Sequence, residues 1–209
     1  GVRLSLPSNF DQLEWYGLGP HETYPDRARG AAIGRYSTRV AEQYVPYIRP
    51  QEHGHHTQTR WCAVTNGRQG LLISAPELFG FSASNYSIAQ LDEAQHDVDL
   101  KPEPATYLNI DAKHRGLGTA SCGPDTLAKY LLSARRFKWS WSISAFDSKV
   151  DDPADLGRRL LGDHWGGGSR FVLAGEQADQ RLHQAFEQAW LRQGGRCGNR
   201  SGDFGRHRS

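Results

Sequence analysis

The chain has 209 residues, enough for one domain of moderate size with a hydrophobic core. Its 25 basic and 23 acidic residues give a formal net charge of +2, so no strong field would draw it to nucleic acid or to a membrane surface. No apolar run approaches the roughly 18 residues of a membrane-spanning helix. We therefore expect neither nucleic acid nor a membrane as a partner.

The three cysteines indicate a reducing compartment. Cys62, Cys122 and Cys197 are an odd number at wide spacing, which argues against a disulfide framework. Residues 1–10 lack the basic start and apolar block of a signal peptide. We therefore expect a cytoplasmic protein, and the absence of methionine leads us to expect a fragment or a processed chain.

Residues 1–146 have the pattern of an all-β domain, in which short aromatic and β-branched runs alternate with turn residues. The expected strands are residues 13–16, 58–64, 71–74, 80–83, 106–110, 129–132 and 137–145. Such a series of short strands favours a β-sandwich. In the last strand, Phe137, Trp139, Trp141 and Ile143 share one face, which we expect to lie in the core.

One short helix is expected at residues 87–95, between the fourth and fifth strands. Ser87 is placed to cap its N-terminus, and Gln90 is placed to complete a capping box.

The segment that follows the first strand, residues 17–27, combines conformational restriction with charge. Its two glycines allow backbone angles closed to other residues, and its two prolines fix φ. It also carries Glu22, Asp26 and Arg27. Two interpretations stay open: the three charges fasten the loop to its own domain, or they form a contact with another domain.

Residues 52–56, Glu-His-Gly-His-His, contain the residue types that bind zinc. His55 and His56 are adjacent, however, and adjacent side chains in an extended strand point in opposite directions. We therefore predict no metal site in this chain.

The glycine loop, residues 116–124, is the segment most suggestive of function. Its glycines raise the question of phosphate binding, but no lysine follows in the P-loop pattern and no helix is expected after it. We therefore do not expect a phosphate site.

Residues 147–209 change in composition, because arginine and glycine become frequent and lysine disappears after Lys149. Residues 176–193 have helical spacing of apolar side chains, and the polar, basic end is expected to be disordered. The segment is interpreted as an unstructured extension, native or frame-shifted, in preference to a tail that binds nucleic acid.

Five short motifs follow one another along residues 1–146. They are Gly17-Leu18-Gly19-Pro20-x-Glu22-x-Tyr24-x-Asp26-Arg27, Tyr44-x-Pro46-Tyr47, Pro50-Gln51-Glu52-His53-Gly54 leading to Thr59-Arg60-Trp61, Leu108-Asn109-Ile110-Asp111, and Gly116-Leu117-Gly118-Thr119-Ala120-Ser121-Cys122-Gly123-Pro124. This series resembles the C-terminal sandwich domain, of the small-chain type, of family-2 glycoside hydrolases of the bacterial β-galactosidase type. The resemblance does not extend beyond about residue 146.

The resemblance sharpens the expected fold to a large antiparallel β-sandwich of the galactose-mutarotase-like type. Members of the family begin this domain upstream of the residue matching Gly1, so the sandwich is expected to be incomplete at its N-terminus. Missing strands expose unpaired sheet edges. Residues 1–146 alone are therefore predicted to be unstable or prone to association.

The resemblance also implies a function. The parent enzyme would hydrolyse terminal β-D-galactosides such as lactose with retention, a reaction that needs two facing carboxyl groups. The family's catalytic glutamates lie in an upstream barrel, so none of the acidic candidates here is assigned as catalytic; they are Glu14, Glu22, Glu52, Glu77 and Asp111. Magnesium and sodium ions are expected in that upstream part, and the expected partners are the barrel, a galactoside and further copies of the enzyme.

In the family, the glycine loop forms one wall of the sugar site. Cys122 stands where some members carry a tryptophan, and a thiol offers far less contact area than an indole. Cys122 is the substrate-binding candidate, with Ser121 as a weaker one, and the alternative is that Cys122 is a small buried hydrophobe. Asn109 and Asp111 are expected to fix the strand and its turn.

The alternative function is a stand-alone, non-catalytic carbohydrate-binding module. Such a module would need exposed aromatic side chains arranged as a flat platform. The candidates are Trp15, Tyr24, Tyr47 and Trp61, and the same four side chains could equally belong to the core.

Overall fold

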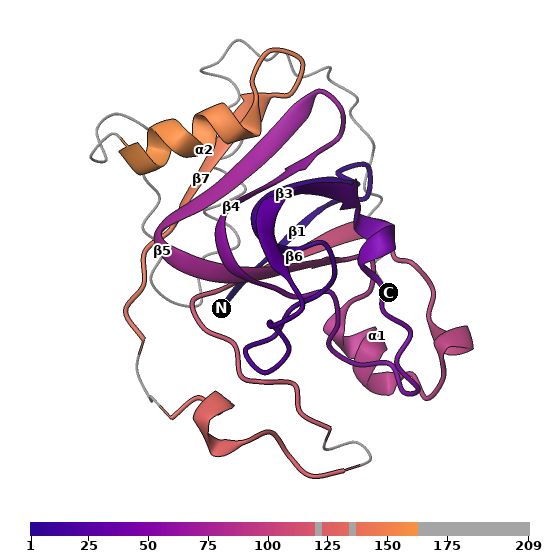
Figure 1. The fold of residues 1–209 in the computed structure, drawn as a ribbon. Helices are drawn as coiled ribbons and strands as arrows, with labels where there is room; N and C mark the ends of the chain where they lie inside the picture. The colour runs from indigo at the N-terminus through magenta and orange to yellow at the C-terminus, as the bar shows by residue number, and fades with distance from the viewer. Residues whose placement is uncertain (120–122, 134–136, 163–209) are drawn as a thin grey trace, which may run out of the picture. The chain divides into compact units, whose positions relative to one another are not determined.

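The computed structural model describes residues 1–119, 123–133 and 137–162 (Figure 1). These residues belong to one compact unit, which lies within Gly1–Val172. The helix predicted at residues 176–193 and the disorder predicted for residues 196–209 concern residues outside the described part of the chain.

Within the described residues, the unit is built on one seven-stranded antiparallel sheet (Figure 1). Its order is β1-β6-β5-β4-β2-β3, and β7 pairs with β5 off this path. The strands are β1 (Val2–Pro7), β2 (Gln12–Gly19), β3 (Ala32–Arg39), β4 (His56–Thr65), β5 (Gln69–Ser84), β6 (Ala105–Asp111) and β7 (Ser142–Asp147). The all-β, antiparallel prediction is confirmed and the sheet is consistent with a sandwich, whereas the galactose-mutarotase-like type stays a prediction.

Strand β5 is the longest strand described, with 16 residues, and it joins the separate parts of the sheet. Its first part, from Gln69 to Ser74, pairs with β7, and its last part, from Gly80 to Ser84, pairs with β6. The sequence predicts strands 71–74 and 80–83 as separate elements, with Pro76 between them. The proline instead lies in an exposed stretch between the two pairings, where its missing N–H interrupts no ladder of the sheet.

The alternation of side chains along β2 places aromatic rings on both faces of the sheet. Trp15 is almost fully buried, and its ring lies 4.2 Å from that of His56 and 5.9 Å from that of Phe81, centroid to centroid. The next residue, Tyr16, packs on the other side against a second buried cluster.

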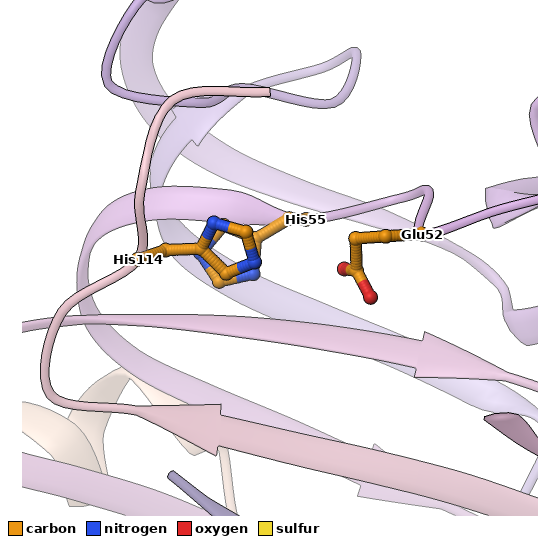
Figure 2. Close-up of side chains that lie close together, drawn as sticks. All are labelled: Glu52, His55 and His114. Carbon is orange, nitrogen blue, oxygen red and sulfur yellow. The ribbon is translucent and has the colours of Figure 1, made fainter. Parts of the chain in front are cut away.

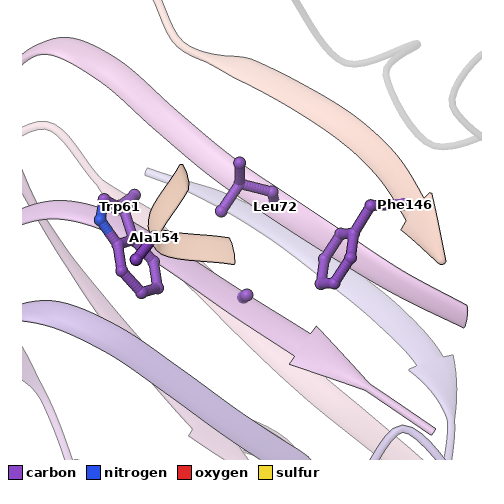
Figure 3. Packing of buried hydrophobic residues seen from close by; sticks show 5 residues of the cluster. Trp61, Leu72, Phe146 and Ala154 are labelled. Carbon is purple, nitrogen blue, oxygen red and sulfur yellow. The ribbon is translucent and has the colours of Figure 1, made fainter. Parts of the chain in front are cut away.

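The second cluster lies beneath helix α2 (Pro153–Gly162), which packs against β4 and β5. Figure 3 shows its residues: Trp61, Ala63, Leu72, Phe146 and Ala154. Gly157 of the helix approaches so closely that an added Cβ would lie 2.5 Å from Cδ1 of Trp61. The sequence pattern did not predict this helix.

Helix α1 (Ile88–Glu93) begins where predicted, because the Ser87 hydroxyl accepts a 3.2 Å hydrogen bond from the Gln90 backbone N–H. The predicted capping box is only half formed, because its second hydrogen bond, from the Ser87 backbone N–H to the Gln90 side chain, is absent. Glu103, rather than Gln90, accepts from the Ser87 backbone N–H, and it also accepts a 3.0 Å bond from the Gln90 side chain. Short 3-10 helices occur at η1 (Val40–Gln43), η2 (Asp97–Asp99) and η3 (Ala128–Tyr130).

Two strand predictions need correction, and two strands have no counterpart among the predictions. Residues 129–132 form no strand: part of the run is η3, and its leucines are exposed instead of packing in the core. Only the end of the predicted strand 137–145 is extended in the sheet as β7, and Phe137 is 52% exposed whereas Trp141 is buried. Strands β1 and β3 were not predicted.

In the part of the chain that the structure describes, no helix is long and apolar enough to cross a bilayer.

Candidate functional site

The two residues expected to face a sugar, Ser121 and Cys122, lie outside the described residues. The structure does describe the base of the glycine loop on either side of them, and how that base is held.

Asn109, in β6, accepts a 2.8 Å bond from Arg3 and donates a 3.0 Å bond to Ser82, so it fixes the strand as expected.

The carboxylate of Asp26 holds the start of the glycine loop. It accepts hydrogen bonds from the backbone N–H groups of Leu117, at 3.0 Å, and Gly118, at 2.9 Å, and from the Thr126 hydroxyl, at 3.2 Å. Burial alone would raise the pKa of Asp26, but these donors outweigh it and the pKa lies below the ordinary value of 3.8. Gly118 has φ +67°, where a side chain would be strained and would meet Thr126.

Arg27 holds the same turn from its other side. One guanidinium nitrogen donates a 2.7 Å bond to the carbonyl oxygen of Gly118, and the other donates a 3.1 Å bond to the hydroxyl of Tyr47. That hydroxyl donates in turn to Glu22, whose second oxygen accepts a 2.8 Å bond from the backbone N–H of Gly54. Burial and the Glu22 carboxylate both raise the pKa of Tyr47, so the hydroxyl keeps its proton.

Among the described residues, these contacts favour the first interpretation of segment 17–27, in which the three charges fasten the loop to its own domain. Glu22, Asp26 and Arg27 fasten three loops of one domain together: their own, the loop that contains Tyr47 and Gly54, and the base of the glycine loop. A rigid base is what a loop needs in order to hold a side chain at a fixed place in a binding site.

The adjacent side chains of His55 and His56 have different surroundings, as expected if they point in opposite directions. The Nε2 of His56 lies 2.6 Å from Oε1 of Gln43, and burial lowers the pKa of His56 to about 4. His55 is 0% exposed, and its ring packs against those of Tyr24 and His114. The two histidines therefore do not converge on one point.

His55 converges instead with two residues from other places in the sequence. Figure 2 shows Glu52, from the loop before β4, and His114, from the segment after β6, beside His55. Their potential ligand atoms all lie within 4.8 Å of one another. Burial raises the pKa of Glu52 to about 7, in spite of the opposing effect of His114, and the nearby Asp111 and Glu22 raise it further. Sequence spacing within residues 52–56 could not reveal this group, because its third member is far along the chain.

The aromatic side chains considered as a sugar platform belong mainly to the interior. Trp15, Tyr24 and Trp61 are buried, and Tyr47 is half-buried and hydrogen-bonded to Arg27 and Glu22. These four side chains therefore do not form the exposed, flat platform that a stand-alone carbohydrate-binding module would need.

Comparison with known proteins identifies related sequences for most of the described region. The family model described as "Beta galactosidase small chain" matches residues 1–143. The β-galactosidase of Staphylococcus xylosus is 34% identical over 143 residues, which is 68% of this chain and 14% of that protein. That of Arthrobacter sp. (strain B7) is 38% identical over 63% of this chain, and that of Vibrio cholerae (strain O395) is 42% identical over 56%. The chain spans about 14% or less of the length of these relatives.

Proposed function

The chain belongs to the beta-galactosidase small-chain family, and on this premise we propose that it is the C-terminal portion of a β-galactosidase whose glycine loop lines the sugar site. The observation that carries the proposal is the fixed base of that loop, held by Asp26 on one side and by Arg27 on the other. A loop held in this way supports a wall of a binding pocket better than a free surface loop does.

The substrate proposed for the complete enzyme is a terminal β-D-galactoside such as lactose, cleaved with retention. Two carboxyl groups about 5–5.5 Å apart perform that chemistry, one as acid and base and one as nucleophile. We place both in the upstream barrel, together with the expected magnesium and sodium ions, so no step is derived through those ions and no residue of this chain is assigned to bond cleavage.

The role proposed for this chain is to close the sugar site and to exclude water from one side of it. Cys122 would contact the sugar or the leaving group over a small area, because a thiol presents less apolar surface than the tryptophan of some family members. We further propose that the chain packs on the barrel, in a homo-oligomeric enzyme of the cytoplasm.

Complementation tests the proposal directly. Hydrolysis of a chromogenic β-galactoside is measured with this chain alone, with the separately expressed barrel portion alone, and with the two mixed. We expect activity only in the mixture. Activity of this chain alone would overturn the placement of the carboxylates and direct attention to Glu52 and Asp111, whose pKa values burial raises.

Titration with galactose or lactose, followed by tryptophan emission, tests the alternative module. The burial of Trp15 and Trp61 leads us to expect no saturable change with the isolated chain. Saturation in the millimolar range would favour the module over the completing domain.

A further inference from the structure

The unusual feature of the group formed by Glu52, His55 and His114 is the state of its central histidine. His55 is 0% exposed, and neither of its ring nitrogens has a hydrogen-bond partner among the described residues. Leaving a polar group buried without a partner destabilises a protein, so such groups call for an explanation. Within the part of the chain that the structure describes, His53 and His56 each have a ring nitrogen bonded, to Gln51 and Gln43, and Nδ1 of His56 lacks a partner; of these three histidines, His55 alone has neither nitrogen bonded.

His114 is oriented as a metal-binding histidine is. Its Nδ1 lies 2.7 Å from the carbonyl oxygen of Arg115, and a nitrogen in that position carries the proton and donates it. The lone pair of the neutral ring is then on Nε2, the other nitrogen. A backbone carbonyl that fixes the tautomer in this way is the usual outer-shell partner of a ligating histidine.

The carboxylates around the group supply compensating charge. Glu52 offers a ligand oxygen, and Oδ2 of Asp111 lies 4.0 Å from Nδ1 of His55. This second carboxylate adds negative charge beside His55, and negative charge favours a bound cation. Glu52 also lines a small hollow with Arg3, Ser82, Tyr107 and Asn109, which gives the group a polar approach.

From this geometry we propose that Glu52, His55 and His114 bind one divalent transition-metal ion, of which zinc is the best match. Two imidazoles and one carboxylate are a recognised zinc ligand set, with a fourth position left for water. Calcium and magnesium prefer oxygen ligands in larger number and are disfavoured by the two histidines.

Binding requires a small inward movement of the ligands. At zinc–ligand distances of about 2.0–2.1 Å, tetrahedral ligands lie roughly 3.3 Å apart, closer than the 4.8 Å limit within which these atoms lie. His55 is held by packing on Tyr24 and against Gly80, whereas Glu52 and His114 are only half-buried and belong to loops. Glu52 and His114 are therefore the ligands that move.

The bound ion would join two segments that also flank the glycine loop. It would connect residues 52–55 to His114, two positions before Gly116, and would hold the loop independently of Asp26 and Arg27. The inference does not depend on the proposed galactosidase role, because it rests on the ligand group alone.

Zinc titration of the full 209-residue chain, after treatment with a chelator, tests the site. Competition with a chromophoric chelator gives the affinity, and elemental analysis gives the number of ions bound. We expect His114→Asn and Glu52→Gln each to weaken binding at the site at least about 10-fold. His21→Asn and His96→Asn are the matched controls, because both side chains are exposed, and both should bind zinc as the unaltered chain does.

Two further readouts separate this site from ions bound elsewhere. Cobalt in place of zinc should give visible bands without a thiolate charge-transfer band, because no cysteine belongs to the proposed ligand set. Zinc should raise the melting temperature of the unaltered chain but not that of His114→Asn, whose metal-free melting temperature should stay unchanged. Absence of zinc binding at micromolar free zinc, a thiolate band, or undiminished affinity in His114→Asn would each overturn the proposal.

Discussion

The guanidinium of Arg27 donates a 2.7 Å hydrogen bond to the carbonyl oxygen of Gly118, 91 positions further along the chain. The same side chain reaches the hydroxyl of Tyr47, so one residue joins two loops that the sequence keeps far apart. The glycine loop therefore owes the fixed position of its base to a few long-range polar contacts.

Arg27→Lys should loosen this base. A lysine ammonium is a point charge on a flexible stem and cannot reproduce the fork that reaches both Tyr47 and Gly118. We expect a loss of about 1 kcal/mol in the free energy of unfolding, measured in urea, and a lower rate in the complementation assay. Arg158→Lys is the control, because the Arg158–Asp155 pair is exposed and pairs of that kind contribute little. An equal loss in both variants would contradict the role given to Arg27.

Asp26→Asn should have a larger effect than Arg27→Lys. An amide cannot replace an ionised carboxylate that accepts two backbone N–H bonds and one hydroxyl bond, and its own NH₂ group would face donors. We expect a loss of about 1–3 kcal/mol in unfolding free energy at neutral pH. Asp155→Asn, at an exposed position on α2, should change the stability much less.

The contribution of Asp26 should also depend on pH. Its folded-state pKa lies below the ordinary value of 3.8, so its stabilising contribution is present above that value and is lost as the pH falls through the folded pKa. The difference in stability between the unaltered chain and Asp26→Asn should therefore be constant from pH 7 to about pH 5 and shrink below about pH 4. Denaturant unfolding at a series of pH values measures it, and a difference that persists at pH 2 would show that the carboxylate's charge is not the cause.

Gly157→Leu should separate helix α2 from the sheet. Any Cβ at this position meets the indole of Trp61, so a large side chain forces the helix away and exposes the cluster beneath it. We expect a red shift of tryptophan emission and a loss of about 1–3 kcal/mol in stability. Arg159→Leu adds the same side chain at an exposed position of the helix and should leave the emission unchanged.

Cys122→Trp tests whether the glycine loop reaches the sugar. In the reconstituted enzyme, an indole at this position should change acceptor preference or the rate of leaving-group release, because it adds a broad apolar surface. Folding of the chain should change little, as judged from its melting temperature. Identical kinetics with several leaving groups would show that the loop stays away from the substrate.

The parts of the fold that follow from local pattern were predictable from the sequence. Strands β2, β4 and β6 each carry a run of aromatic and β-branched residues between turn residues, and the cap at Ser87 follows from its spacing to Gln90. Strand β3 was missed because its side chains are mostly exposed, so its place in the sheet depends on pairing with β2 rather than on burial.

The features that depend on distant partners were not predictable. Residues 129–132 have the apolar composition of a strand but pair with no strand among the described residues. Helix α2 is positioned by its packing on Trp61, which is distant in the sequence. The group of Glu52, His55 and His114 was missed for the same reason, since nothing in the sequence near residues 52–56 points to a histidine beyond β6.

The position of β5 between β4, β6 and β7 has a consequence for folding kinetics. Strand β1 pairs with β6, and the Arg3–Asn109 hydrogen bond between them joins residues 106 positions apart. Strand β7 pairs with the first part of β5, at the other end from β6. Loop-closure entropy must be lost before these pairings stabilise the chain, so folding should take milliseconds to seconds. During that interval β5 is an apolar strand with open edges, and a chaperone that covers it would raise the yield of the folded chain.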